Sequence, residues 1–235
     1  MRTAAILPVK RFPLAKQRLG ESVADSLRAD LARAMVGDVL SALRECPAIE
    51  STLVVTSESS VATAALYVGA IVVEDSAEEG QSAAASIGLA RALQEGFERA
   101  LCVPGDCPTL DPAELTDLLG QESVAVVIVP DRHGSGTNGL LLTPPEALSP
   151  SFGPDSRARH ERLAREAGAA WRIEHPASLL LDIDTGEDLA VLRERLAGER
   201  VRAPRTRAVL GRSDERRSEP DESAGTASSR SSRTA

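Results

Sequence analysis

Apolar residues in this chain fall into short runs that are separated by longer stretches with helical spacing. The short runs are rich in Val, Ile and Leu and predict strands over 3–9, 51–57, 69–75, 99–105, 123–130, 139–145 and 178–184. The stretches between them predict helices over 21–45, 59–67, 81–96, 111–120, 156–168 and 185–197. Strands that alternate with helices and lack a polar face are typical of a mostly parallel sheet with helices on both faces. The pattern therefore predicts an α/β fold.

The alternation of predicted strands and helices ends near residue 198. The 235-residue chain is long enough for one large domain, which we place at residues 1–198. From Glu199 onward the sequence is rich in Ser, Arg and Glu. Such a composition buries too little apolar surface to fold, so residues 199–235 are predicted to form a disordered tail.

The charge balance argues against a nucleic-acid partner. The net charge is −8, and because the tail holds nine arginines and six acids, residues 1–198 carry −11. Such a surface repels polyanions, and 2% aromatic residues leave little for base stacking. Three cysteines without zinc-ligand spacing indicate a reducing, cytoplasmic location, and no apolar run is long enough for a membrane helix. A homodimer is possible.

Two lysines distinguish the first predicted loop. Of 27 basic residues only Lys10 and Lys16 are lysines, and this loop also carries Arg11 and Arg18. Lysine is a compact charge on a flexible stem, whereas arginine is a planar fork, so retention of lysine in an arginine-rich chain suggests contact with a phosphate. A solvated basic loop is the alternative. The loop has neither a dinucleotide-binding nor a P-loop glycine motif.

Acidic residues follow two of the predicted strands. In "VPGDCPTLDP", Asp106 ends a strand while Asp111 is better placed to cap the next helix. In "LLLDIDTGEDL", Asp182 and Asp184 point to the same side of an extended chain, and Thr185 can cap the following helix. Like charges this close repel unless a cation neutralises them, which suggests a metal site. Capping or simple solvation is the alternative for each carboxylate.

Two glycine-rich turns complete the candidate site. "HGSGTNGLLL" carries Thr137 into a strand, and "FGPDSRARH" places Gly153 and Ser156 at the start of a helix. Arg157 and Arg159 follow in its first turn, where cations are unfavourable unless an anion binds there. A helix cap with solvated arginines is the alternative. His160 is interpreted as a helix-face residue, so the sequence shows no general base.

Taken together, "LPVK", "AKQRL", "GDCP", "GTNGLLL", "FGPDS" and "LDIDTGEDL" resemble the guanylyltransferases of coenzyme F-420 biosynthesis, the CofC/FbiD family, over about residues 4–196. The resemblance implies a GT-A-like nucleotidyltransferase fold, which is an α/β sandwich. It also implies an enzyme that joins GTP to a small phosphorylated carboxylic acid and releases pyrophosphate. Phosphoenolpyruvate is the expected acid. The resemblance implies Mg²⁺ on Asp106, Asp182 and Asp184. It further implies Lys16 and Arg18 as catalytic residues, contacts of Thr137, Gly153 and Ser156 with the acid, and contacts of Lys10, Lys16, Gly80 and Ser82 with the nucleotide.

One departure from the family pattern keeps other functions open. Where the family usually has Gly-Leu-Asn before the third helix, this chain has Gly80-Gln81-Ser82. A related transferase that uses 2-phospho-L-lactate, a phosphoglycerate or another nucleotide is one alternative. A non-catalytic GTP-binding relative is the other.

Overall fold

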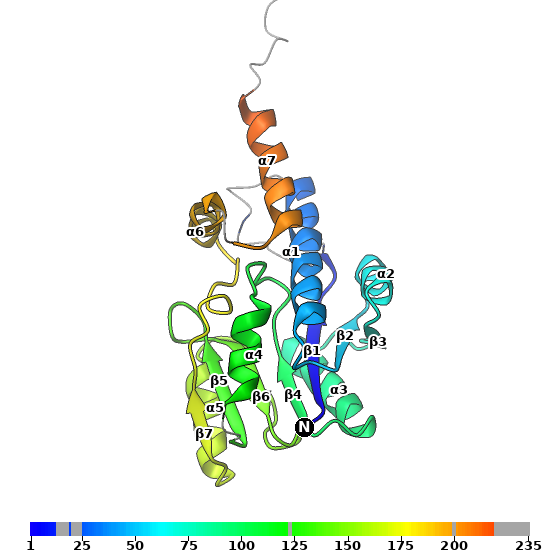
Figure 1. Cartoon of the computed structure of the whole chain (residues 1–235), viewed down its shortest axis with the longest axis vertical. Helices are drawn as coiled ribbons and strands as arrows, with labels where there is room; N and C mark the ends of the chain where they lie inside the picture. Colours follow the sequence, from blue (N-terminus) through cyan, green and yellow to red (C-terminus); the bar gives the residue numbers. More distant parts are fainter. Residues whose placement is uncertain (13–18, 20–24, 122–123, 199–200, 219–235) are drawn as a thin grey trace, which may run out of the picture.

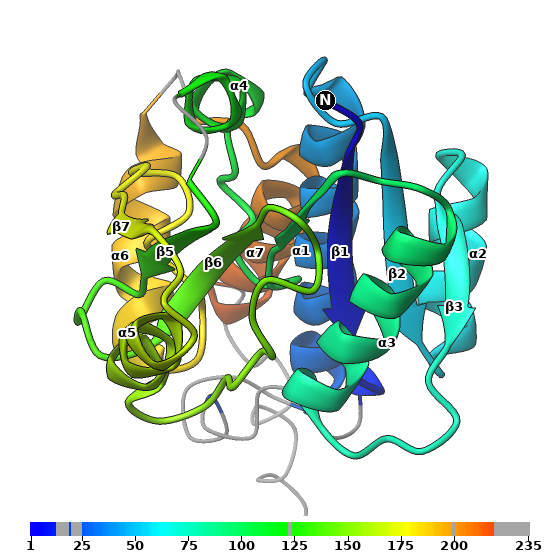
Figure 2. The ribbon, with the colours of Figure 1, turned by 90° about the horizontal axis from the view of Figure 1, so that it is seen from below.

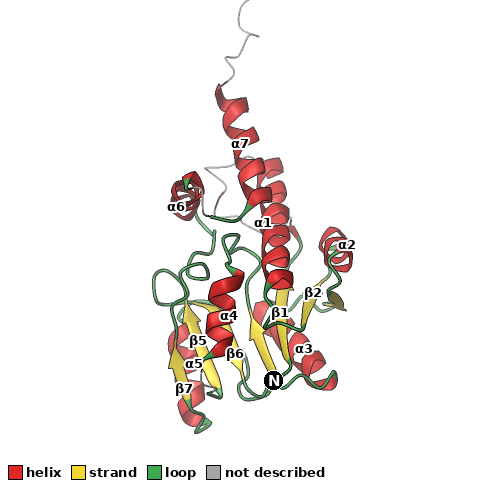
Figure 3. Cartoon of the chain, in the orientation of Figure 1, coloured by secondary structure: helices red, strands yellow, loops and turns green. Residues whose placement is uncertain are grey.

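The computed structural model describes residues 1–12, 19, 25–121, 124–198 and 201–218, which form a sheet with helices around it (Figures 1 and 3). The strands are β1 (Thr3–Val9), β2 (Ser51–Thr56), β3 (Ile71–Glu74), β4 (Arg99–Cys102), β5 (Val126–Pro130), β6 (Thr137–Leu142) and β7 (Trp171–Ile173). The helices are α1 (Asp25–Glu45), α2 (Ser59–Tyr67), α3 (Gln81–Gln94), α4 (Pro112–Gly120), α5 (Ser156–Glu166), α6 (Gly186–Ala197) and α7 (Pro204–Ser218). Among these helices, none combines the length and apolar character of a membrane span.

The sheet has the strand order β3-β2-β1-β4-β6-β5-β7, and within it only β6 runs against the other strands. Alternate residues of the strands pack against different helices. One core joins them to α1, α2 and α4, and the other joins them to α3 and α5. Figure 2 shows α1 and α3 on opposite sides of β1. The predicted α/β class, the mostly parallel sheet and the helices on both faces are confirmed.

The carboxyl ends of the parallel strands gather at one edge of this sheet, and α3 begins at that edge. The helix lies close to the sheet because Gly88 has no side chain. A Cβ at this position would overlap Cγ2 of Ile6 on β1 and lie 3.0 Å from Cγ2 of Val55 on β2. This contact fixes where the first turn of α3 lies relative to the loop after β1.

The prediction of a strand over 178–184 is wrong. Leu179, Leu181 and Ile183 are all buried, which explains the strand-like pattern, but their backbone bonds to loops. The Leu179 N–H bonds the Pro176 carbonyl, and the Ile183 N–H bonds the Asp106 carbonyl. The last strand of the sheet, next to β5, is instead β7. This short strand pairs in parallel with β5, and the sequence pattern did not predict it.

The prediction of disorder after residue 198 is wrong for Pro204–Ser218, which form α7 beside α1 (Figure 1). Val209 and Leu210 are buried in a third core, which is built mainly from α1, α6 and α7 and also contains Leu181 and Ile183. The first turn of α7 is held by Asp38 of α1. The Asp38 carboxylate accepts hydrogen bonds from the Arg205 N–H at 3.1 Å and the Thr206 N–H at 2.8 Å. The carboxylate therefore caps a helix that is distant in sequence.

Replacement of Asp38 tests this attachment. We expect Asp38→Ala to lower the free energy of unfolding by about 1–3 kcal/mol, because one buried and one partly buried N–H group lose a charged acceptor. The matched control is Asp30→Ala on the same helix, which removes only an exposed pair with Arg33 and should cost less than about 1 kcal/mol. Denaturant unfolding measures both. Equal losses in the two variants would contradict the capping role.

Candidate functional site

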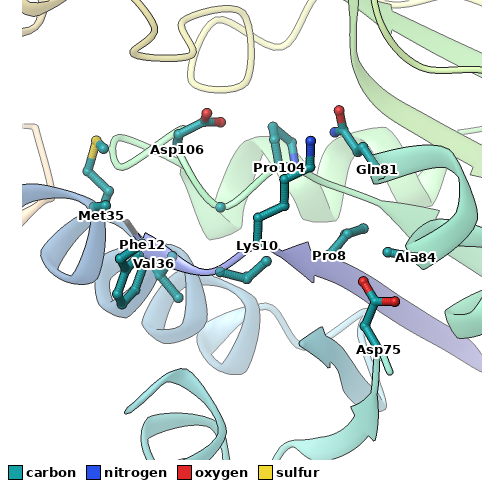
Figure 4. Close-up of a pocket in the computed structure, with 13 residues that line it drawn as sticks. Pro8, Lys10, Phe12, Met35, Val36, Asp75, Gln81, Ala84, Pro104 and Asp106 are labelled. Carbon is teal, nitrogen blue, oxygen red and sulfur yellow. The ribbon is translucent and has the colours of Figure 1, made fainter. Parts of the chain in front are cut away.

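A pocket of about 240 Å³ opens at the carboxyl edge of the sheet (Figure 4). The loops after β1, β3 and β4 contribute Lys10, Asp75 and Asp106, and the first turn of α3 contributes Gln81. Met35 and Val36 of α1 form an apolar part of the wall. The structure thus brings together Lys10 and Asp106, which are 96 positions apart in the sequence, as the parallel order of the strands requires.

The predicted acidic residues meet beside this pocket. The Ile183 N–H donates to the Asp106 carbonyl at 3.1 Å and joins the two acidic segments. Burial, together with the negative charges of Asp106 and Asp184 and against a hydrogen bond from Asn138, raises the pKa of Asp182 to about 6. The three carboxylates therefore repel one another in the absence of a cation.

This arrangement fits Mg²⁺ only as an open site. In the part of the chain that the structure describes, no three acidic, histidine or cysteine side chains are already gathered as a metal centre. Mg²⁺ usually keeps several waters and binds one or two carboxylates together with substrate phosphates, so a closed protein cage is not required. The hard oxygen donors and the mutual repulsion around Asp182 suit that role.

The residues predicted for the acid substrate lie around His160. The imidazole is fully buried, and burial followed by the charge of Arg159 lowers the pKa of His160 to about 4, so it is neutral at pH 7. Its Nε2 accepts from the Ser151 N–H at 2.9 Å, which places the proton on Nδ1. Nδ1 lies 3.0 Å from the Thr137 hydroxyl oxygen, which accepts a hydrogen bond from Nδ1–H, so the hydroxyl can donate its own hydrogen to a ligand. His160 therefore orients Thr137.

Gly153 and Ser156 stand next to the same histidine. Ser156 is buried one helical turn before His160, on the same face of α5. Gly153 has φ of +109°, a conformation that favours glycine. The Ser156 N–H bonds the Gly153 carbonyl at 3.1 Å and closes the turn. The predicted acid-binding residues thus come from the start of β6 and from the turn that leads into α5.

The arginines of this turn form contacts within the protein. The Arg159 guanidinium donates to the Ser151 hydroxyl and to the carbonyls of Ser151, Phe152 and Pro154. These bonds hold the loop, and anion binding by Arg159 stays a prediction. Arg157 forms an ion pair with Glu161 at 3.5 Å.

Two side chains, Ser82 and Asn138, connect the separate parts of the site by hydrogen bonds. The Ser82 hydroxyl accepts from the Phe152 N–H at 2.8 Å, which ties the predicted nucleotide segment to the acid-binding turn. The Asn138 amide donates to Asp182 at 3.2 Å and to the Leu179 carbonyl at 2.9 Å, which ties β6 to the acidic segment. Gly80, with φ of +106°, directly precedes α3. The predicted groups are therefore neighbours.

A third connection runs through Asp188, which is buried in the first turn of α6. Its carboxylate accepts from the N–H groups of Asp184 at 3.1 Å and Thr185 at 2.7 Å, and it pairs with Arg132 at 2.7 Å. Burial raises the pKa of Asp188, but the hydrogen bonds and the Arg132 charge outweigh burial and lower it overall. Arg132 lies in the turn before β6, so this pair joins that turn to the acidic segment.

Lys16 and Arg18 lie outside the described residues, and their assignment stays a prediction. Sequence reasoning missed Asp75, Asn138 and the Arg132–Asp188 pair. Asp75 follows a strand as Asp106 does, so the same argument was available for it. The Thr185 cap of α6 was predicted, but no local signal marks the contact of Asp188 with Arg132, which comes from a distant loop.

Comparison with known proteins identifies the family of this chain. The family model "Guanylyl transferase CofC like" matches residues 3–203. A phosphoenolpyruvate guanylyltransferase of Conexibacter woesei is 50% identical over 89% of this chain and 96% of its own length. A 2-phospho-L-lactate guanylyltransferase of Methanothermobacter thermautotrophicus is 34% identical over 80% and 83% of the two chains.

Solved structures with low sequence identity share the fold. A protein of Desulfovibrio desulfuricans, provisionally described as a nucleotide-diphospho-sugar transferase, gives a TM-score of 0.72 at 18% identity and covers 92% of this chain and 96% of its own. A nucleotidyl transferase from Methanothermobacter gives 0.59 at 20% identity, with 83% and 97% covered. The fold is therefore that of nucleotidyltransferases.

Replacement of Asp182 tests the repulsion among the carboxylates. Its pKa is higher in the folded chain than in the unfolded chain, so the free energy of unfolding falls as pH rises from about 4 to about 6. Asp182→Asn removes this penalty. In Mg²⁺-free buffer at pH 8 we expect Asp182→Asn to have a higher Tm than the parent protein, with a gain in the free energy of unfolding of no more than about 3 kcal/mol. Near pH 4 we expect the two proteins to have the same Tm.

The control is Asp117→Asn, an exposed carboxylate of α4, which should leave the pH profile unchanged. Thermal melting across this pH range measures all three proteins. A loss of several degrees in Asp182→Asn at pH 8 would show that the carboxylate is structural.

Asp188→Ala should lower the free energy of unfolding by about 1–3 kcal/mol at pH 7, because it removes an ionic acceptor from two partly buried N–H groups. Glu187→Ala is the matched control, since Glu187 contacts the same Arg132 but is 74% exposed and should cost less than about 1 kcal/mol. The contribution of Asp188, whose pKa is lowered, is present above the ordinary pKa of aspartate and disappears as pH falls below it. Equal unfolding free energies for the two variants would contradict this role.

Proposed function

Because the chain belongs to the CofC-like guanylyl transferases, we propose that it joins GTP to phosphoenolpyruvate in coenzyme F-420 biosynthesis. The products are enolpyruvyl-diphosphoguanosine and pyrophosphate. The observation that supports this reaction is the convergence of Lys10, the carboxylates around Asp182 and the Thr137–Ser156 group at one edge of the sheet. The buried, free cysteines of the described chain fit the expected cytoplasmic location.

The chemical step is a displacement at phosphorus. A phosphate oxygen of the acid forms a bond to the α-phosphorus of GTP. The bond from the α-phosphorus to the oxygen that bridges it to the β-phosphorus breaks. The electron pair leaves on pyrophosphate. The attacking phosphate is already ionised at neutral pH, so no side chain has to remove a proton. Both nitrogens of His160 are engaged in hydrogen bonds, which agrees with a reaction that needs no general base.

The residues of the chain position and neutralise the reactants. Thr137, Gly153 and Ser156 would hold the carboxylate and phosphate of the acid, with Thr137 oriented by His160. Lys10 would lie along the triphosphate and offset its negative charge. Mg²⁺, held by Asp106, Asp182 and Asp184, would supply the further positive charge that these carboxylates and the phosphates require.

Pyrophosphate release tests the reaction. The purified protein is incubated with GTP and Mg²⁺ together with equal concentrations of phosphoenolpyruvate, 2-phospho-L-lactate and 3-phosphoglycerate, and the products are resolved by mass. We expect the phosphoenolpyruvate product to dominate by a margin worth about 1–3 kcal/mol, because the three acids share the groups that are bound. Omission of Mg²⁺ should abolish turnover.

Variants connect the activity to the site. Asp106→Asn should reduce kcat by at least about 100-fold, because one metal ligand and its charge are lost, whereas Asp117→Asn should remain active. A dominant phospholactate product would change the acid but keep the reaction class. Binding of GTP without pyrophosphate release from any acid would favour the non-catalytic alternative.

A further inference from the structure

The pocket contains one buried carboxylate that the proposed reaction does not use. Asp75 follows β3, is 5% exposed and lines the pocket opposite Asp106 (Figure 4). We propose that Asp75 recognises the Watson–Crick edge of guanine and selects GTP over other nucleotides. This inference rests on the proposed function, because it assigns the base of the same nucleotide to one end of the same pocket.

The two ends of the pocket differ in chemistry. Figure 4 shows the Lys10 side chain between Asp106 and Asp75. The triphosphate belongs near Asp106 and Lys10, where its charge is neutralised. The base must then occupy the remaining part of the pocket, which has Pro8 and Ala84 as apolar walls and Asp75 as its acidic end. Apolar walls with one fixed polar group are typical of sites that bind a planar base.

The Asp75 carboxylate can accept further hydrogen bonds from a bound base. One of its oxygens accepts from the Glu78 N–H at 3.1 Å, and this is a single bond on a group that can accept about four. Within the described ranges, no cationic side chain pairs with it, although the carboxylate is almost fully buried. A buried carboxylate normally has charged or multiple hydrogen-bond partners. Two donors from a bound base would supply them.

A purely structural role for Asp75 is the alternative. Its bond to Glu78 closes a short turn, and aspartate often has this role in loops. Asparagine can make the same bond, because its amide oxygen accepts equally from the backbone. The replacement Asp75→Asn therefore keeps the turn and removes only the acceptor pair that guanine needs.

The nucleobases distinguish these roles by their donors. Guanine presents N1–H and the 2-amino group, and a carboxylate accepts from both. Hypoxanthine keeps N1–H but lacks the amino group, and adenine presents an unprotonated N1 that repels the carboxylate. Xanthine carries a carbonyl at C2, which repels Asp75 but accepts a hydrogen bond from an asparagine amide. The proposal thus predicts a change of specificity as well as a loss of affinity.

Equilibrium binding is the primary measurement, because it does not depend on the reaction. Calorimetric titration of the full chain with GTP, ITP, XTP and ATP should show GTP bound most tightly, with ITP weaker by about tenfold. In Asp75→Asn we expect GTP affinity to fall by at least about 30-fold and XTP to bind at least as well as GTP. Asp75→Glu should bind GTP more weakly while still preferring it to XTP.

The matched control is Glu74→Gln, which changes the neighbouring carboxylate, an exposed one at the end of β3, and should keep the parent order of affinities. Thermal melting confirms that each variant is folded. An unchanged GTP to XTP ratio in folded Asp75→Asn, or a parent protein that binds XTP as well as GTP, would overturn the proposal. Tight GTP binding without pyrophosphate release would overturn the proposed reaction while leaving the role of Asp75 intact.

Discussion

Repulsion among negative charges at the carboxyl edge of the sheet is the constraint on which the rest of the site depends. Asp182 is held beside Asp106 and Asp184, and both burial and these neighbours raise its pKa. The folded chain must supply the force that keeps the three together. Leu181 and Ile183 do so by packing into the core between α1 and α6, and Asn138 and Asp188 do so by hydrogen bonds. In the proposed reaction, a bound Mg²⁺ would offset the cost of this concentrated charge.

At this edge of the sheet some polar side chains hold the loops in place, while others are predicted to bind the substrates. Arg159, Ser82 and His160 lie beside the residues predicted to bind substrate, and each forms hydrogen bonds within the protein. Their bonds fix the loops that carry Thr137, Gly153 and the first turn of α3. A transfer between two ionised phosphates requires well-placed charges more than a proton acceptor, so a buried, neutral histidine suits this site better as a support than as a base.

Helix α7 extends this support beyond residue 203, where the match to the family model ends. Its Val209 and Leu210 share a core with Met35 of α1, and Met35 also lines the pocket. The cap from Asp38 fixes the beginning of the helix, where four N–H groups otherwise lack partners. A segment of highly polar composition is thus held by a few apolar side chains and one buried carboxylate.

The sequence by itself determined the fold class and most elements, because Val- and Leu-rich strands alternate with amphipathic helices. The hydrophobic pattern of each element is set by residues that are close together in the sequence. The sequence also indicated Asp106, Asp182, Thr137 and Ser156, since each lies next to a strand or helix end where ligands bind in such folds. The tertiary structure alone decided that 178–184 bonds to loops and that Pro204–Ser218 packs on α1. It also placed Asp75 opposite Asp106. These facts depend on contacts between residues far apart in the chain, which no local period or composition encodes.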